Sequence, residues 1–143
     1  MPTSALNKYQ DFADQLGKNI HNLNTATFKA AFTNAAPNAA THAVLADITQ
    51  LSTGGGYTGG AGGGVTLTGT GYTETGGVGS FVASDAVFTA SGGSVGPFRY
   101  VAIYNDTATG DPLVGYYDYG SAITLADGES LTLDFGSSIF TIT

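Results

Sequence analysis

Residues 98–135 read FRYVAIYNDTATGDPLVGYYDYGSAITLADGESLTLDF and decide the fold. Residues 98–104 are apolar on both faces of an extended chain, which predicts a strand buried on both sides. The polar loop 105–111 suits a hairpin that leads into a second strand at 112–119. Polar and apolar residues alternate over 130–135, which predicts a strand with one face inward. The stretch therefore indicates antiparallel β-structure joined by tight, polar turns.

Further short strands are expected on both sides of this stretch, at 27–33, 65–74, 79–82 with 85–90 as one bent strand, and 139–143. Short strands separated by glycine-rich turns favour a mainly β fold, either an antiparallel β-sandwich or a jelly-roll-like barrel. We expect the core to include Phe28, Val101, Ile103, Leu131, Leu133 and Phe135.

The N-terminal segment is predicted to carry a short α-helix over residues 4–20. Its apolar face would consist of Leu6, Tyr9, Phe12, Ala13, Leu16 and Ile20. Ser4 suits the N-cap and Gly17 suits the helix end. The apolar face would dock on the chain's own β-domain or on an oligomer neighbour, or else serve as a free recognition helix.

The expected organisation is an N-terminal helical segment, 1–24, followed by a single β-domain, 25–143. A glycine-rich loop at 53–64 is predicted to be flexible, and residues 42–48 could form one helical turn. Residues 1–10 show no signal-peptide pattern and no stretch is apolar enough to span a membrane, so we expect a chain used in a cytoplasm.

The composition limits the kinds of partner that the protein can bind. The 143 residues carry a formal net charge of -7 and no cysteine. A negative surface repels phosphate, so nucleic acid and anionic membranes are poor partners. Charged residues make up only 10% of the chain, which suits a protein packed against neighbours better than a free monomer.

The sequence predicts no enzyme and no cofactor. The GGGYTGGAGGG run at 54–64 lacks the Lys-Ser/Thr of a phosphate-binding loop and precedes a strand. His21 and His42 have no metal-ligating partners at the expected spacings and are predicted to be surface or capping histidines. Three aspartates near one hairpin end could bind calcium or could serve turn chemistry alone: Asp106, Asp111 and Asp118.

Tyrosine side chains give the remaining signal. Tyr116 and Tyr117 are adjacent in a predicted strand, so they point to opposite faces, and one of them must meet solvent or a partner. Interface contact and aromatic pairing across strands both explain such residues. The candidate interface residues are Leu6, Tyr9, Phe12, Leu16, Tyr57, Tyr116 and Tyr117.

Three segments resemble a family of small virion structural proteins of tailed bacteriophages and prophages. They are HNLNTATFKAAFTNAAP at 21–37, ADITQLSTGGGYTGG at 46–60, and the stretch at 98–135. The shared pattern runs through "T-F-K", "D-I…G-Y-T-G-G", "R-Y-V-x-I-Y-N-D-T" and "P-L-V-G-Y-x-D-Y-G-S", in this order. None of these is a catalytic motif, and the resemblance carries over no functional residue.

The resemblance implies a virion protein, assembled in the host cytoplasm, that binds and stabilises the capsid as a decoration or cement protein. Its partner would be the major capsid protein or another virion protein. A homo-oligomer is expected, with a trimer favoured, because closed symmetry is usual for homo-oligomers. Two alternatives stay open, a tail, neck or fibre-anchoring component and a carbohydrate-binding β-sandwich whose exposed tyrosines would stack on sugars.

Overall fold

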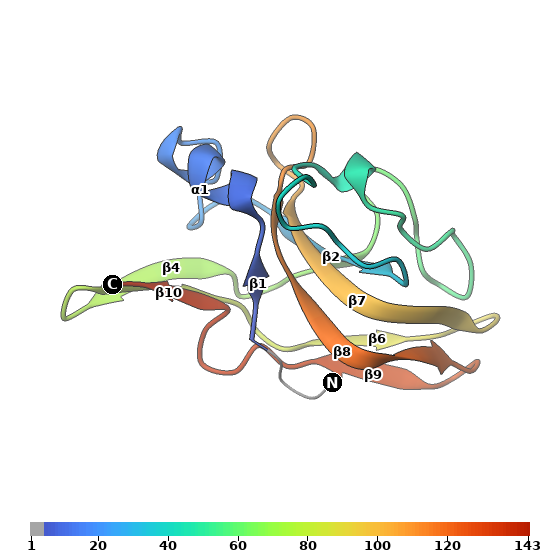
Figure 1. Ribbon diagram of the computed structural model, residues 1–143. Coiled ribbons are helices and arrows are strands. Elements are labelled where there is room, and N and C mark those ends of the chain that lie inside the picture. The colour runs from blue at the N-terminus through green and yellow to red at the C-terminus, as the bar shows by residue number, and fades with distance from the viewer. Residues whose placement is uncertain (1–4) are drawn as a thin grey trace.

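The two longest strands, β7 (Val95–Asn105) and β8 (Leu113–Leu125), form a hairpin in the central sheet of the fold. The computed structural model describes residues 5–143 and shows a mainly β, antiparallel sandwich with one short α-helix (Figure 1). This confirms the predicted mainly β fold class, and the sheets have a sandwich-like arrangement.

The remaining elements are β1 (Asn7–Lys8), α1 (Gln10–Gly17), β2 (Phe28–Thr33), the 3-10 turn η1 (Leu45–Asp47), β3 (Val65–Thr66), β4 (Gly71–Thr75), β5 (Val78–Val82), β6 (Ala86–Thr89), β9 (Ser130–Leu133) and β10 (Phe140–Ile142). Within residues 5–143, no helix is both long and apolar enough to cross a membrane.

A five-stranded sheet in the order β1-β8-β7-β2-β3 forms the central layer. The second layer consists of two smaller sheets, β10-β5-β4 and β6-β9. Along this layer β5 leads into β6 and pairs with β10, while β6 pairs with β9. The prediction of one bent strand over 79–90 is therefore close to the structure, in which a short break separates β5 from β6.

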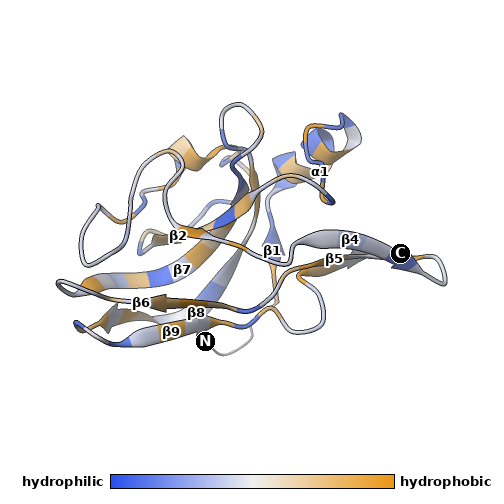
Figure 2. Cartoon of the chain, turned by 180° about the vertical axis from the view of Figure 1, so that it is seen from behind, coloured by the Kyte–Doolittle hydropathy of each residue, from blue (hydrophilic) through white to orange (hydrophobic). Residues whose placement is uncertain are grey.

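The main core lies between the two layers and is rich in phenylalanine. The Phe32 ring stacks on Phe98 at 4.5 Å and meets Phe88 of the second layer at 5.4 Å. Phe28 contacts Phe81 at 4.9 Å in the same way. Figure 2 shows apolar bands along β2, β6 and β7, the strands that enclose this core.

The central sheet is also covered on its outer face. Ala102 and Tyr104 of β7 point there and are fully buried. Leu45 and Ile48, from the η1 region, and Tyr9 cover them. This agrees with the prediction that 98–104 is buried on both sides. All six expected core residues are buried.

The N-terminal prediction was too long and partly of the wrong type. Residues 7–8 form a strand paired with β8, and the α-helix spans only Gln10–Gly17. Tyr9 is extended at the helix N-cap, and Ile20 lies beyond the helix with 43% of its surface exposed. A strand followed by a helix can place apolar residues at the same three- and four-residue spacings as one helix. The predicted Ser4 cap lies outside the described residues.

The predicted strand 65–74 is divided between two layers. The Leu67 amide donates a hydrogen bond to the Phe28 carbonyl, and this is the last hydrogen bond between the β3 segment and β2. Gly69 then adopts a positive φ of 62°, and the chain crosses to β4 in the second layer. A glycine is suited to this backbone conformation because it has no Cβ. The 42–48 turn is confirmed in shortened form as η1.

Leu133 tests the packing between the layers. It is 2% exposed in the main core, so Leu133→Ala should lower the free energy of unfolding by about 2–5 kcal/mol through lost burial and a cavity. Val87 of the paired strand β6 is 63% exposed, and Val87→Ala should change it by less than about 0.5 kcal/mol. Urea denaturation measures both, and equal losses would contradict the assigned faces of β6 and β9.

Candidate functional site

The glycine-rich segment 53–64 is anchored in the main core. Its one aromatic side chain, Tyr57, is 1% exposed and stacks on Phe32 at 5.1 Å. The Tyr57 hydroxyl accepts a hydrogen bond from the Phe32 amide at 2.9 Å and donates one to Gln50 Oε1 at 2.6 Å. Burial raises the pKa of Tyr57 to about 12, so the hydroxyl keeps its proton at neutral pH. The prediction of a flexible loop missed this anchor.

Three more side chains hold the loop through its backbone carbonyls. Gln50 Nε2 donates to the Gly60 carbonyl at 3.2 Å, and Lys29 Nζ donates to the Gly62 carbonyl at 2.7 Å. The buried hydroxyl of Tyr104 donates to the Gly63 carbonyl. The loop is thereby attached to β2, β7 and residue 50 at successive positions.

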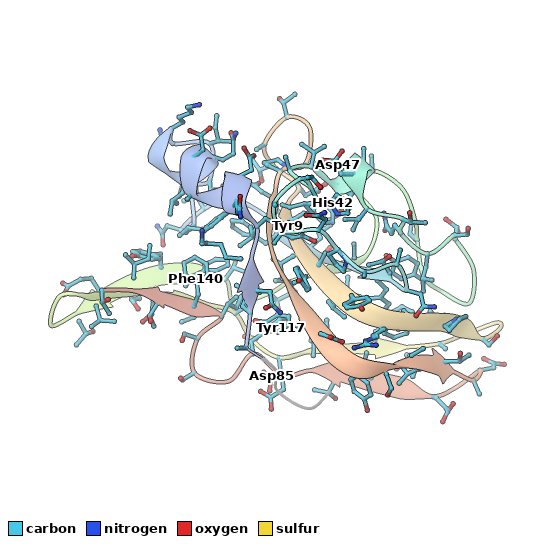
Figure 3. The ribbon with its side chains drawn as sticks, in the orientation of Figure 1. Tyr9, His42, Asp47, Asp85, Tyr117 and Phe140 are labelled. Carbon is cyan, nitrogen blue, oxygen red and sulfur yellow. The ribbon has the colours of Figure 1, made fainter. Side chains whose placement is uncertain are left out.

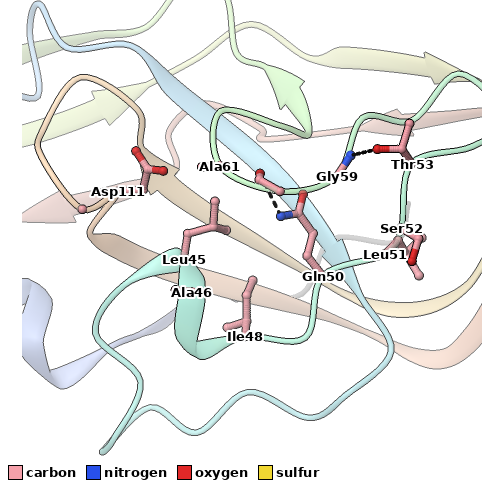
Figure 4. A pocket seen from close by; sticks show the side chains of 12 residues that line it. Leu45, Ala46, Ile48, Gln50, Leu51, Ser52, Thr53, Gly59, Ala61 and Asp111 are labelled. Carbon is pink, nitrogen blue, oxygen red and sulfur yellow. Dashed lines mark hydrogen bonds between the residues drawn. The ribbon is translucent and has the colours of Figure 1, made fainter.

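An open groove with a volume of about 740 Å³ lies between this loop and the segment that follows η1 (Figure 4). Its lining is Leu45, Ala46, Ile48, Gln50, Leu51, Ser52, Thr53, Gly59, Gly60, Ala61, Gly110 and Asp111. Most of these side chains are small or polar, and none is aromatic. Figure 4 shows Gln50 reaching across the groove and Thr53 bonded to Gly59. The groove can bind extended polar chains, but its described lining gives sugar rings no stacking platform.

The three aspartates considered as calcium ligands do not form one group, although Asp106 and Asp111 lie near each other. Asp118 is paired with Arg99, with 2.8 Å between Oδ1 and Nε. Asp106 lies 3.3 Å from Lys29 Nζ. Burial, and then the nearby charge of Asp106, raise the pKa of Asp111. Among residues 5–143, no three His, Cys, Asp or Glu side chains form a group that could hold a metal ion.

The two histidines differ in environment. His42 is half-buried, and its Nδ1 accepts the Asn38 amide at 3.1 Å, so it caps a turn as the sequence suggested (Figure 3). His21 is 3% exposed, which corrects its assignment to the surface. Its ring packs between Phe12 at 4.9 Å and Phe28 at 6.4 Å. Burial lowers the pKa of His21 to about 4, so the ring is neutral near pH 7.

Most of the candidate interface residues are enclosed by the chain itself. Tyr9, Phe12, Tyr57 and Tyr117 are buried, so their side chains are not available to a partner in this structure. Figure 3 shows Tyr9 and Tyr117 at different heights beside β1 and β8. Tyr117 belongs to the inner core and Tyr116 packs against the outer cluster, which confirms that they point to opposite faces. Leu6, Leu16 and Tyr116 remain partly exposed.

Leu6 and Leu16 lie in a second, smaller groove of about 220 Å³ between α1 and β10. Its lining is Leu6, Lys8, Phe12, Ala13, Leu16, Val114, Phe140, Thr141 and Ile142. Ile142, on the edge strand β10, is 42% exposed. This groove is predominantly apolar and brings the N-terminal segment beside the last strand. Sequence reasoning identified its helix side and missed β10, because their proximity arises only from the tertiary fold.

Comparison of the chain with protein-family models, with curated proteins and with solved structures found no match.

The shape of the 740 Å³ groove depends on the close approach of Gly59 to the backbone of residues 51–53. A Cβ at Gly59 would lie 2.4 Å from the Leu51 carbonyl oxygen, so Gly59→Ala should lower the free energy of unfolding by about 1–3 kcal/mol through overpacking. A Cβ at Gly54, in the same loop, would meet nothing within 4 Å. Gly54→Ala is therefore the matched control, and thermal denaturation of both should show destabilisation at Gly59 alone. Equal stability of the two variants would mean that the loop is not held against residues 51–53.

Proposed function

We propose that the protein is a structural component of a tailed-phage virion that binds the assembled capsid and stabilises it. The observation that carries the proposal is the arrangement of the three segments that resemble such proteins. Although they are separated in sequence, they pack into one continuous unit. Residues 28–33 pair with β7 along their whole length. The Leu51 amide donates to the Phe32 carbonyl at 2.9 Å, and Tyr57 bonds the same residue.

The resemblance therefore covers a continuous part of the fold: β2, β7 and β8 of the main sheet, β9 of the second layer, and the segment 46–60 that packs beside β2. A shared sequence pattern restricted to scattered turns would have been weaker support. Scarce charge adds to the proposal, because a capsid-bound protein exposes less of its surface to water than a free monomer does. Many copies on one shell can hold through weak individual contacts, since binding to the assembled state stabilises it by mass action.

The apolar groove between α1 and β10 is the surface we propose for the contact. Leu16 and Ile142 flank it, and Lys8 provides a single cationic group in a chain of net charge -7. The partner would be the major capsid protein or another virion protein. A homo-oligomer, with a trimer favoured, would fit a symmetric shell.

Deletion of the N-terminal segment, 1–24, does not test this surface alone. Tyr9 and Phe12 are part of the two cores, so removal of residues 1–24 would take away core side chains as well as a binding surface. Point substitutions at the groove are therefore the cleaner test.

Ile142→Asp places a charge in the groove and should strongly reduce occupancy on purified heads. Val87→Asp is the matched control, since Val87 is also an exposed aliphatic side chain on an edge strand, outside this groove. Occupancy is measured as copies per major capsid protein by quantitative electrophoresis, and heads are then challenged by heat with and without the protein. Wild-type copies confined to the portal or tail would reject the capsid role and favour the neck, tail or fibre alternative. Equal occupancy of both variants would reject the groove as the contact.

A further inference from the structure

Residues 11–26 form an excursion from the sandwich, which we call the flap. It contains most of α1 and the turns that lead to β2. The chain is fixed just before the flap, where the Gln10 amide donates to the Ala39 carbonyl at 2.8 Å. It is fixed again just after, where the Thr27 amide donates to Thr107 Oγ1 at 2.8 Å.

Between these points the flap is held mainly by apolar contacts. Phe12, Leu23 and Ala26 are buried in the main core, and the Phe12 ring meets Phe140 edge-on at 5.5 Å. Beyond the first turn of α1, two hydrogen bonds join the flap to the rest of the described chain. Both come from the side-chain amide of Asn105, to the Ile20 carbonyl at 3.5 Å and to His21 Nδ1 at 3.2 Å.

The surroundings of Asn105 fix which of its atoms faces the histidine. Asn105 is 1% exposed, and its Oδ1 accepts the amides of Thr107 and Ala108 at 3.0 and 3.1 Å. Its Nδ2, a donor, is therefore the atom directed at His21. The histidine must accept through Nδ1 and carry its proton on Nε2.

A second proton on this ring would have no acceptor. A protonated Nδ1 would direct its N–H at the N–H of Asn105 Nδ2, and Nε2 is already buried without a hydrogen-bond partner. A buried cation between Phe12 and Phe28 is costly unless it is paired. Release of the flap into water would hydrate both nitrogens.

From this arrangement we infer that His21 and Asn105 form an acid-sensitive latch, which holds the flap closed at neutral pH and favours its opening in mild acid. Opening would uncover the phenylalanines beneath the flap, including Phe28 and Phe140, while the β7–β8 hairpin stays folded. Opening would also remove the flap side of the groove beside β10, since Phe12, Ala13 and Leu16 line it.

Nearby charges do not cancel the effect. On α1, Asp11 favours the protonated ring, but this effect is smaller than that of burial. Asp14, also on α1, is paired with Lys18 at 2.7 Å. On β2 and the 105–111 turn, Lys29 and Asp106 are paired with each other.

The sign and size of the effect follow from linkage. A histidine with a lowered pKa in the closed state stabilises that state fully above its ordinary pKa of 6.5, and this stability is lost as pH falls toward about 4. Flap opening should then become about 20-fold more favourable at pH 5 than at pH 7.

Hydrogen exchange on the full chain, read residue by residue by NMR, tests this inference. Protection factors of flap amides 15–20 should fall by about 20-fold from pH 7 to pH 5, after correction for intrinsic rates, while those of amides 101–103 in β7 stay constant. His21→Gln keeps an acceptor for Asn105 but cannot titrate, so its flap protection should not depend on pH in this range. His42→Gln is the matched control and should keep the wild-type fall.

Asn105→Asp provides a second variant that does not depend on the folding of His21→Gln. A carboxylate facing the ring would accept a hydrogen bond from the protonated Nδ1 of His21. The protection factors of the flap amides should therefore stay constant or rise at pH 5. The latch is overturned if wild-type flap protection is unchanged between pH 7 and pH 5, or if either His21→Gln or Asn105→Asp retains the wild-type fall.

Discussion

Burial of β7 on both faces is the constraint on which the rest of the structure depends. An interior strand with apolar side chains on both sides needs two covers, and a single opposing sheet supplies only one. Val101 and Ile103 pack on the second sheet layer, whereas Ala102 and Tyr104 need a cover on the outer side. The chain between β2 and β3 provides it, with Leu45 and Ile48 placed over β7. Gly64, at the end of this segment, lies directly against the sheet: it has a positive φ and would place a Cβ 2.2 Å from the Ala30 carbonyl oxygen.

The sequence was sufficient for the strands whose environment is set locally. Residues 130–135 alternate with a period of two, and their apolar members are the buried ones. The sequence was insufficient for segments whose structure is set by tertiary contacts. Tyr9 fits a helical pattern but lies in an extended segment, because β1 pairs with the edge of β8. Tyr57 sits in a run of glycines that indicates flexibility, yet its hydroxyl finds the free amide of Phe32 in the folded chain. No local signal in the sequence encodes either contact.

The candidate site shows the same division. Leu6 and Leu16 could be identified from the apolar spacing of the N-terminal segment, while Ile142 could not, since its neighbours in space are far from it in sequence. His21 is the clearest case. Its residue type favoured the surface, but it is buried beside Asn105, a residue 84 positions away. Phe12 belongs to both the flap and the α1–β10 groove, and it contacts Phe140 of that groove, so the proposed capsid contact and the proposed acid response involve one region of the molecule.

The claim that the two covers of β7 form one cooperative unit can be measured directly by native-state hydrogen exchange at pH 7. The informative probe is the amide of Leu45, which belongs to the outer cover and donates to the Asp111 carbonyl at 2.9 Å. If the account is right, this amide exchanges only on global unfolding, with the same free energy as the amides of Ala102 and Ile103 in β7. Exchange of the Leu45 amide through a much smaller opening free energy, while β7 stays protected, would show that the outer cover is dispensable and would contradict the account.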